Sequence, residues 1–186
     1  EHTLALRMRT ARQAIGVLAE HARVPFTFRN ARGSAVGLLK EAVADADITV
    51  FEPARPPMSS VLSGSSTPRH RQRTTAVFSD VKSGQAVLET ALKLADGLVE
   101  RVSILLFPEA GQDADALRNL YKDFLPGKPG HVRSILAGDF KDLAIANRTL
   151  FSSMLVAPAN GLMTSDRSLK FLLAQVRCPV CLVGRY

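Results

Sequence analysis

Three short motifs contain residue types that could contact a bound ligand. Asp80 ends the apolar run 76–78, Gly138-Asp139 follows a second apolar run, and Gly161 lies in the loop after a third. Glycines let backbone N–H groups close around a phosphate, and the first turn of a helix attracts anions. A carboxylate at the end of a strand can contact a ligand or cap the next helix. Both roles stay open for Asp80.

Cys178 and Cys181 have the spacing of a redox-active thiol pair. In redox proteins this spacing stands at the start of a helix, where the two sulfurs meet. Here it begins an apolar segment, residues 179–183, which we expect to be a strand. Residues i and i+3 of a strand point to opposite faces, about 10 Å apart, whereas a disulfide needs Cα atoms within roughly 7 Å. We therefore predict buried, unreactive thiols.

The histidines do not indicate a catalytic or metal centre. The four are His2, His21, His70 and His131. None has a histidine at i+4 or a cysteine partner, so no metal site is expected. No catalytic residues can be named from the sequence, and we expect a protein that is not an enzyme.

The elements that must position these motifs follow from the apolar periodicity of residues 74–186. Strands are expected at residues 74–78, 102–107, 132–136, 154–157 and 179–183, and helices at about 85–98, 114–124, 140–147 and 169–176. This alternation implies right-handed crossovers and a parallel sheet with helices on both faces. Such sheets bind ligands at the carboxyl ends of the strands, where the strand order reverses.

The first part of the chain repeats this pattern in a shorter form. Residues 3–22 and a segment opened by Gly33-Ser34 are predicted to be helices, and residues 25–28 and 48–51 strands. This order parallels the second half from Gly138 to Pro158, which favours a degenerate repeat.

Residues 54–73 separate the two parts. They are rich in proline and serine and end in a basic cluster, Arg69, His70, Arg71 and Arg73. This composition is typical of a linker. The predicted organisation is therefore a partial repeat at 1–53, a linker at 54–73, and a complete domain at 74–186.

Composition narrows the class of protein. Apolar residues make up 46% of the chain and aromatic residues only 6%, which predicts a packed aliphatic core. The net charge is +7, but no aromatic residue interleaves the basic cluster, so we expect a solvated linker and no nucleic-acid partner.

The cellular location is inferred from the sequence only by default. No apolar run approaches the roughly 20 residues that span a bilayer, and no signal peptide is visible, so we expect a cytoplasmic protein. The first residue is Glu1 and not Met, so we expect a fragment or a processed chain, with a membrane link only as part of a longer protein.

The order of the motifs in residues 74–186 resembles that of the universal stress protein family. Asp80 is similar to the Asp after strand one that contacts adenine in nucleotide-binding members. Gly138-Asp139 follows the third predicted strand, as in the family, and Cys178-Pro179-Val180 looks like the start of its closing strand. The resemblance implies a five-stranded parallel sheet of order 3-2-1-4-5, the adenine nucleotide alpha hydrolase-like fold. It also implies an ATP or AMP site that includes Asp80, Gly138 and Gly161, and it extends more weakly to residues 3–53.

The phosphate-binding loop departs from the family's signature of Gly, two residues, Gly, nine residues, then Gly and Ser or Thr. Gly161 matches the second glycine, but Pro158 stands near the first and has no N–H to donate. Asp166-Arg167 falls where Gly-Ser/Thr belongs, in a shortened loop, and we expect Asp166 to cap a helix.

Our hypothesis from these departures is a regulatory or structural module in stress response, with no cofactor and no robust nucleotide binding. The alternatives are an ATP- or AMP-binding universal stress protein and a cytosolic regulatory domain of a longer membrane transporter or sensor.

The resemblance also predicts association. In the family the last strand pairs with its counterpart in a second domain, and here the first part has no closing strand to supply one. We therefore expect a homodimer in which residues 179–183 meet the same residues of a second chain, or a larger closed oligomer. A protein partner is the alternative. Residues 3–53 should also pack on a partner, because their two strands need neighbours.

Overall fold

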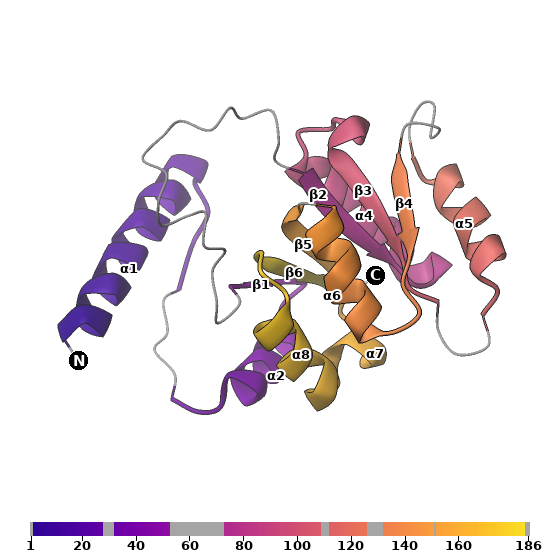
Figure 1. Cartoon of the computed structure of the whole chain (residues 1–186). Coiled ribbons are helices and arrows are strands. Elements are labelled where there is room, and N and C mark those ends of the chain that lie inside the picture. The colour runs from indigo at the N-terminus through magenta and orange to yellow at the C-terminus, as the bar shows by residue number, and fades with distance from the viewer. Residues whose placement is uncertain are drawn as a thin grey trace. The chain divides into compact units, whose positions relative to one another are not determined.

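The computed structural model describes residues 2–27, 32–52, 73–108, 112–125, 132–150 and 152–184 (Figure 1). The chain divides into two compact units, residues 1–34 and residues 35–186. The first unit contains the helix α1 (His2–Ala22), which was predicted. The strand predicted at 25–28 is not formed at residues 25–27, and residue 28 lies outside the described residues. Pro25 lacks the N–H that a sheet ladder needs, and short strands are stable only beside a neighbour.

The second unit is built on a six-stranded sheet. The strands are β1 (Ile48–Phe51), β2 (Arg73–Phe78), β3 (Val102–Leu106), β4 (Arg133–Leu136), β5 (Ser152–Pro158) and β6 (Val180–Val183). Their order is β1-β6-β5-β2-β3-β4. Strands β2 to β6 are all parallel, in the predicted 3-2-1-4-5 order, so the predicted fold class is confirmed. The sheet has one strand more than predicted, because β1 pairs antiparallel with β6.

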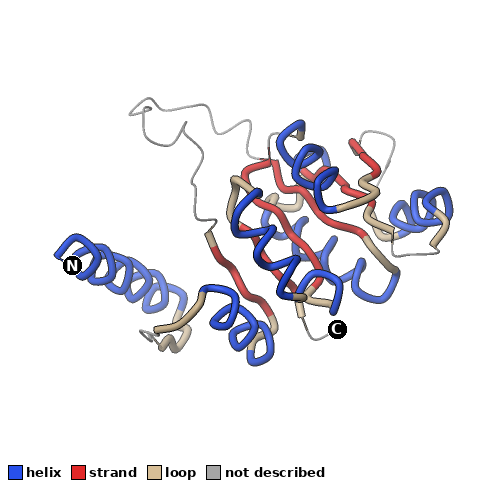
Figure 2. The backbone as a smooth tube through the Cα atoms, turned by 60° about the horizontal axis from the view of Figure 1, so that its bottom comes forward, coloured by secondary structure: helices blue, strands red, loops and turns tan. Residues whose placement is uncertain are grey.

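Helices cover both faces of this sheet (Figure 2). They are α2 (Ala35–Asp45), α4 (Val81–Leu94), α5 (Ala114–Asp123), α6 (Phe140–Thr149), α7 (Gly161–Thr164) and α8 (Asp166–Gln175), with a short 3-10 helix at Val99–Arg101. One core cluster joins the sheet to α4 and α5 and contains Phe78, Leu88 and Tyr121. The other joins the opposite face to α2, α6 and α8 and contains Leu143, Leu169 and Leu172. None of the described helices is long and apolar enough to cross a lipid bilayer.

The predicted domain division at residue 53 differs from the division in the structure. Helix α2 and strand β1 belong to the same compact unit as residues 74–186. Thr49 and Val50 of β1 lie opposite Leu182 and Cys181 of β6. A strand has backbone N–H and C=O groups that need partners, and the edge of β6 supplies them within the same chain. The first half is therefore not a separate partial domain, and β1 needs no second protein.

The predicted dimer contact through residues 179–183 requires β6 to be an edge strand. In the structure β6 lies between β5 and β1, so its edges are already paired within the chain. The edges of the described sheet are instead β1 and β4. Association of the chain with itself or with a partner stays a prediction, and β6 is not the strand that would mediate it.

Candidate functional site

The strand order of the sheet reverses between β2 and β5, and two of the three predicted ligand residues lie there. Asp80 follows β2, and Gly161 follows β5. The loops that carry them touch, because Nδ2 of Asn160 lies 3.5 Å from Oγ of Ser79. Gly138 follows β4, which β3 separates from β2. The structure thus brings Asp80 and Gly161 to one place and leaves Gly138 further along the same edge.

Asp80 is the N-cap of α4. Its Oδ1 accepts a hydrogen bond of 2.8 Å from the backbone N–H of Ser83, and its Oδ2 accepts bonds from the hydroxyls of Ser79 and Ser83. Burial raises the pKa of Asp80, but the hydrogen bonds from Ser83 and Ser79 outweigh that effect and hold the pKa below its ordinary value. Of the two roles left open by the sequence, the structure shows the capping role, which Oδ1 performs, while Oδ2 accepts from the two serine hydroxyls.

Gly138 and the start of α6 form a reciprocal set of hydrogen bonds. Asp139 caps the helix by accepting from the backbone N–H of Asp142 at 2.8 Å. Asp142 reaches back and accepts from the backbone N–H of Gly138 at 3.1 Å. This arrangement resembles a capping box, which satisfies donors at both ends of the first helical turn. The N–H of Gly138, the group that a phosphate would need, is therefore already bound to a carboxylate.

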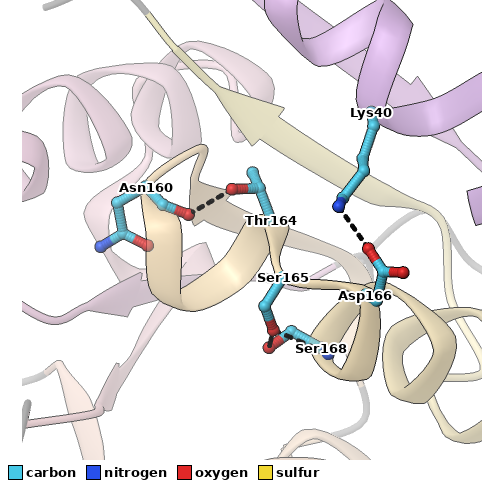
Figure 3. A network of polar contacts seen from close by, with 6 residues as sticks. All are labelled: Lys40, Asn160, Thr164, Ser165, Asp166 and Ser168. Atoms are coloured by element: carbon cyan, nitrogen blue, oxygen red, sulfur yellow. Dashed lines mark hydrogen bonds and ion pairs between the residues drawn. The ribbon is translucent and has the colours of Figure 1, made fainter. Parts of the chain in front are cut away.

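The loop after β5 is closed by its own polar groups (Figure 3). Asn160 caps the single turn α7, because its Oδ1 accepts from the backbone N–H of Met163 at 3.1 Å. The carbonyl of Asn160 accepts from the backbone N–H and the hydroxyl of Thr164, at 2.9 and 2.8 Å. Gly161 begins this turn, and a Cβ added there would meet nothing within 4 Å. No neighbouring atom therefore lies so close to Gly161 that a larger residue would clash with it.

The expectation that Asp166 caps α8 is wrong by one residue. The N-cap is Ser165, whose Oγ accepts from the backbone N–H of Ser168 at 3.2 Å and lies 2.6 Å from the Ser168 hydroxyl. Asp166 is the first residue of the helix and forms an ion pair with Lys40 of α2 (Figure 3). The hydrogen bond and the positive charge of Lys40 lower the pKa of Asp166. A carboxylate of the chain itself thus lies at the helix start where the family has its Gly-Ser/Thr.

The sequence contained a signal for only part of this loop. Serine is a preferred N-cap residue, and Ser165 directly precedes Asp166, an acidic residue in the first turn, so the cap could have been recognised. The role of Lys40 had no such signal, because it depends on α2 packing beside α8.

A separate cleft of about 750 Å³ lies further along the same edge of the sheet. Its lining is aromatic with charged groups, and consists of Phe107, Pro108, Gly138, Asp139, Phe140, Lys141, Leu162, Arg167 and Phe171. Of the residues predicted for the nucleotide site, the cleft shares only Gly138. Sequence reasoning missed this cleft, since its phenylalanines come from three distant segments.

The two cysteines have the properties that the sequence predicted. Both are buried free thiols. Cys178 belongs to the core beneath α6 and α8, and Cys181 to the core on the opposite face. Burial raises the pKa of each thiol, which disfavours the reactive thiolate. In the ranges that the structure describes, no group of three histidine, cysteine or acidic side chains could hold a metal ion.

Comparison with known proteins gives similarities of structure alone. No family model and no curated protein matches the sequence. A functionally unknown protein from Pseudomonas aeruginosa PAO1 is 11% identical with a TM-score of 0.46, over 93% of this chain and 77% of that one. A universal stress protein family member from Burkholderia pseudomallei is 16% identical with a TM-score of 0.37, over 63% of this chain and 98% of that one. A protein named as a putative universal stress protein, from Pseudomonas aeruginosa UCBPP-PA14, is 11% identical with a TM-score of 0.43, over 93% and 78%. These TM-scores lie below 0.5, so the similarities assign no function.

Proposed function

We propose that this chain is a universal-stress-protein-like regulatory module that does not use ATP or AMP and acts by binding another protein. The observation that carries the proposal is that the chain's own side chains bind the polar groups at its carboxyl edge. Asp80, Asp142, Asn160 and Ser165 each accept a hydrogen bond from a backbone N–H in this region. A phosphate would have to displace these bonds, and its own hydrogen bonds to the same N–H groups would bring little net gain.

Charge at the start of α8 supports the same proposal. The positive end of a helix dipole stabilises an anion, and in this chain Asp166 supplies one. The carboxylate forms an ion pair with Lys40, so this cation is also engaged. A polyphosphate approaching this turn would meet a negative charge in place of the glycine and hydroxyl of the family's loop. We propose no enzymatic role for this site.

One observation favours the alternative of an ATP- or AMP-binding protein. Asp80 is only partly buried and is held in its ionised form, at the position that resembles the adenine-contacting Asp. The two functions differ in what happens at the loop after β5. An ATP-binding protein would have to reopen the turn between Asn160 and Thr164.

A thermal shift experiment with two variants separates these functions. The first variant, D166G/R167S, restores the family's residue types at the start of α8. The second, K170G/A174S, makes the same kinds of change at exposed positions later in α8. We expect 1 mM ATP with Mg²⁺ to leave the unfolding temperature of the wild-type chain unchanged. A ligand raises the stability of a protein only when its concentration is comparable to its Kd or above it. A rise of several degrees in the wild-type chain contradicts the proposal. A rise confined to D166G/R167S identifies the start of α8 as the block.

A further inference from the structure

The cleft between α6 and α8 has the construction of a small-molecule site. Its volume, about 750 Å³, falls within the range of pockets that hold small ligands. The carboxyl ends of β3 and β4 lead into Pro108 and Gly138 on one side of it, and α8 contributes Arg167 and Phe171 on the other. The cleft therefore lies at the edge of a parallel sheet where such folds bind ligands.

Three phenylalanines make one wall of the cleft. The ring of Phe140 lies 5.2 Å from that of Phe107 and 5.6 Å from that of Phe171, measured between centroids. Phe107 is buried, while Phe140 and Phe171 are half-buried. Tilted aromatic rings at these spacings pack well on one another and on a further flat apolar group. The wall thus presents half-buried aromatic surface to whatever enters.

Two cations stand in the first turns of the helices that flank the cleft. Lys141 is the second residue of α6, and Arg167 is the second residue of α8. Both are exposed, and within the described ranges neither forms an ion pair with a carboxylate. The one acidic residue in the lining is Asp139, which already accepts the backbone N–H of Asp142. The lining therefore has a net positive charge beside its aromatic wall.

We propose that this cleft binds a small amphiphilic anion, with a flat apolar body and a single carboxylate or sulfonate group. The anionic group lies between Lys141 and Arg167. The body lies against Phe140 and Phe171, since Phe171 is one helical turn beyond Arg167 and so deeper along α8. A single charge fits better than a polyphosphate, because Asp139 in the lining and Asp166 next to Arg167 add two carboxylates near the same rim.

Ligand binding in this cleft does not depend on the proposed function, because Asp80 and Gly161 do not line the cleft. Binding of such a ligand would regulate the proposed module.

Titration of the full chain with naphthalene-2-carboxylate, followed by ¹H–¹⁵N NMR, tests the proposal. We expect saturable shifts at the amides of Phe140, Lys141, Arg167 and Phe171. The neutral analogue naphthalene-2-methanol should bind at least about fivefold more weakly, because a partly solvated charge pair contributes about 1 kcal/mol. The variants K141Q and R167Q should each weaken the carboxylate by a similar factor and leave the neutral analogue unchanged.

The matched control is K170Q. Lys170 is exposed on the same helix but does not line the cleft, so its loss removes one charge and no contact. Equal binding of the neutral analogue, equal weakening by K170Q, or shifts that map elsewhere would overturn the proposal. Adding ATP at the end distinguishes the two failures. If ATP displaces the probe at micromolar concentration, the cleft is a nucleotide site and the proposed function fails. If neither ligand binds, only this inference fails.

Discussion

The carboxylate of Asp142 binds the backbone N–H of Gly138, with 3.1 Å between Oδ2 and the nitrogen. The backbone N–H of Gly138, which the sequence predicted to contact a ligand, is therefore already hydrogen-bonded to a residue four positions later. The same holds at Asp80, whose two carboxylate oxygens accept hydrogen bonds from Ser79 and Ser83. Beside Gly161, the Oδ1 of Asn160 takes the backbone N–H of Met163.

Removing this contact should destabilise the start of α6. In D142A the N–H of Gly138 loses its acceptor, and we expect the free energy of unfolding to fall by about 1 kcal/mol. D142N keeps an acceptor oxygen and should lose less. Urea unfolding followed by circular dichroism measures both. If D142A and D142N lose the same free energy of unfolding, the charge of Asp142, and not its hydrogen bond, stabilises the chain.

Gly84 is a glycine that packing does require. A Cβ at this position of α4 would lie 2.2 Å from Cε2 of Phe78, and both residues are buried. Alanine usually stabilises a helix relative to glycine, but here overpacking should dominate, and we expect G84A to lose about 1–3 kcal/mol. The control is G161A, where nothing lies within 4 Å of the added Cβ. A neutral G84A in the same unfolding assay would contradict the packing described for α4.

Stability should depend on pH through Asp80. Its pKa is lower in the folded chain than in the unfolded chain, so the folded state favours the ionised form. The contribution is therefore complete above the unfolded pKa, near 4, and is lost as pH falls through the folded value. D80N keeps an N-cap but does not titrate. The difference in stability between the wild-type chain and D80N should shrink as pH falls from 5 to 3, and a constant difference would exclude this role.

Thr49 of β1 has a buried hydroxyl with no hydrogen-bond partner in the described parts of the chain. Valine has nearly the same shape without the polar group, so T49V should stabilise the chain by about 1 kcal/mol. Val50 is 57% exposed on the same strand. The reverse change there, V50T, should be nearly neutral. Destabilisation by T49V would contradict the absence of a hydrogen-bond partner for the Thr49 hydroxyl.

The sequence predicted the parallel sheet because the apolar runs of β2 to β6 alternate with helices of ordinary length. The strand order was implied only by the resemblance to the universal stress protein family. The sequence did not predict the position of β1. Ile48 to Phe51 is recognisable as a strand, but its neighbour depends on a contact across more than a hundred residues. For the same reason the ion pair between Lys40 and Asp166 could not be foreseen. The single turn α7 was missed because four residues are too few to show helical periodicity.

Equilibrium dialysis of the full wild-type chain against labelled ATP with Mg²⁺ measures whether a nucleotide binds at the carboxyl edge between β2 and β5. We propose that Asp80, Asn160 and Ser165 close this edge, so that no nucleotide binds there. We predict no saturable retention of the label at protein concentrations up to about 100 μM, where a micromolar Kd would give nearly complete retention. Saturable retention of one ATP per chain, abolished by D80A, would contradict this proposal.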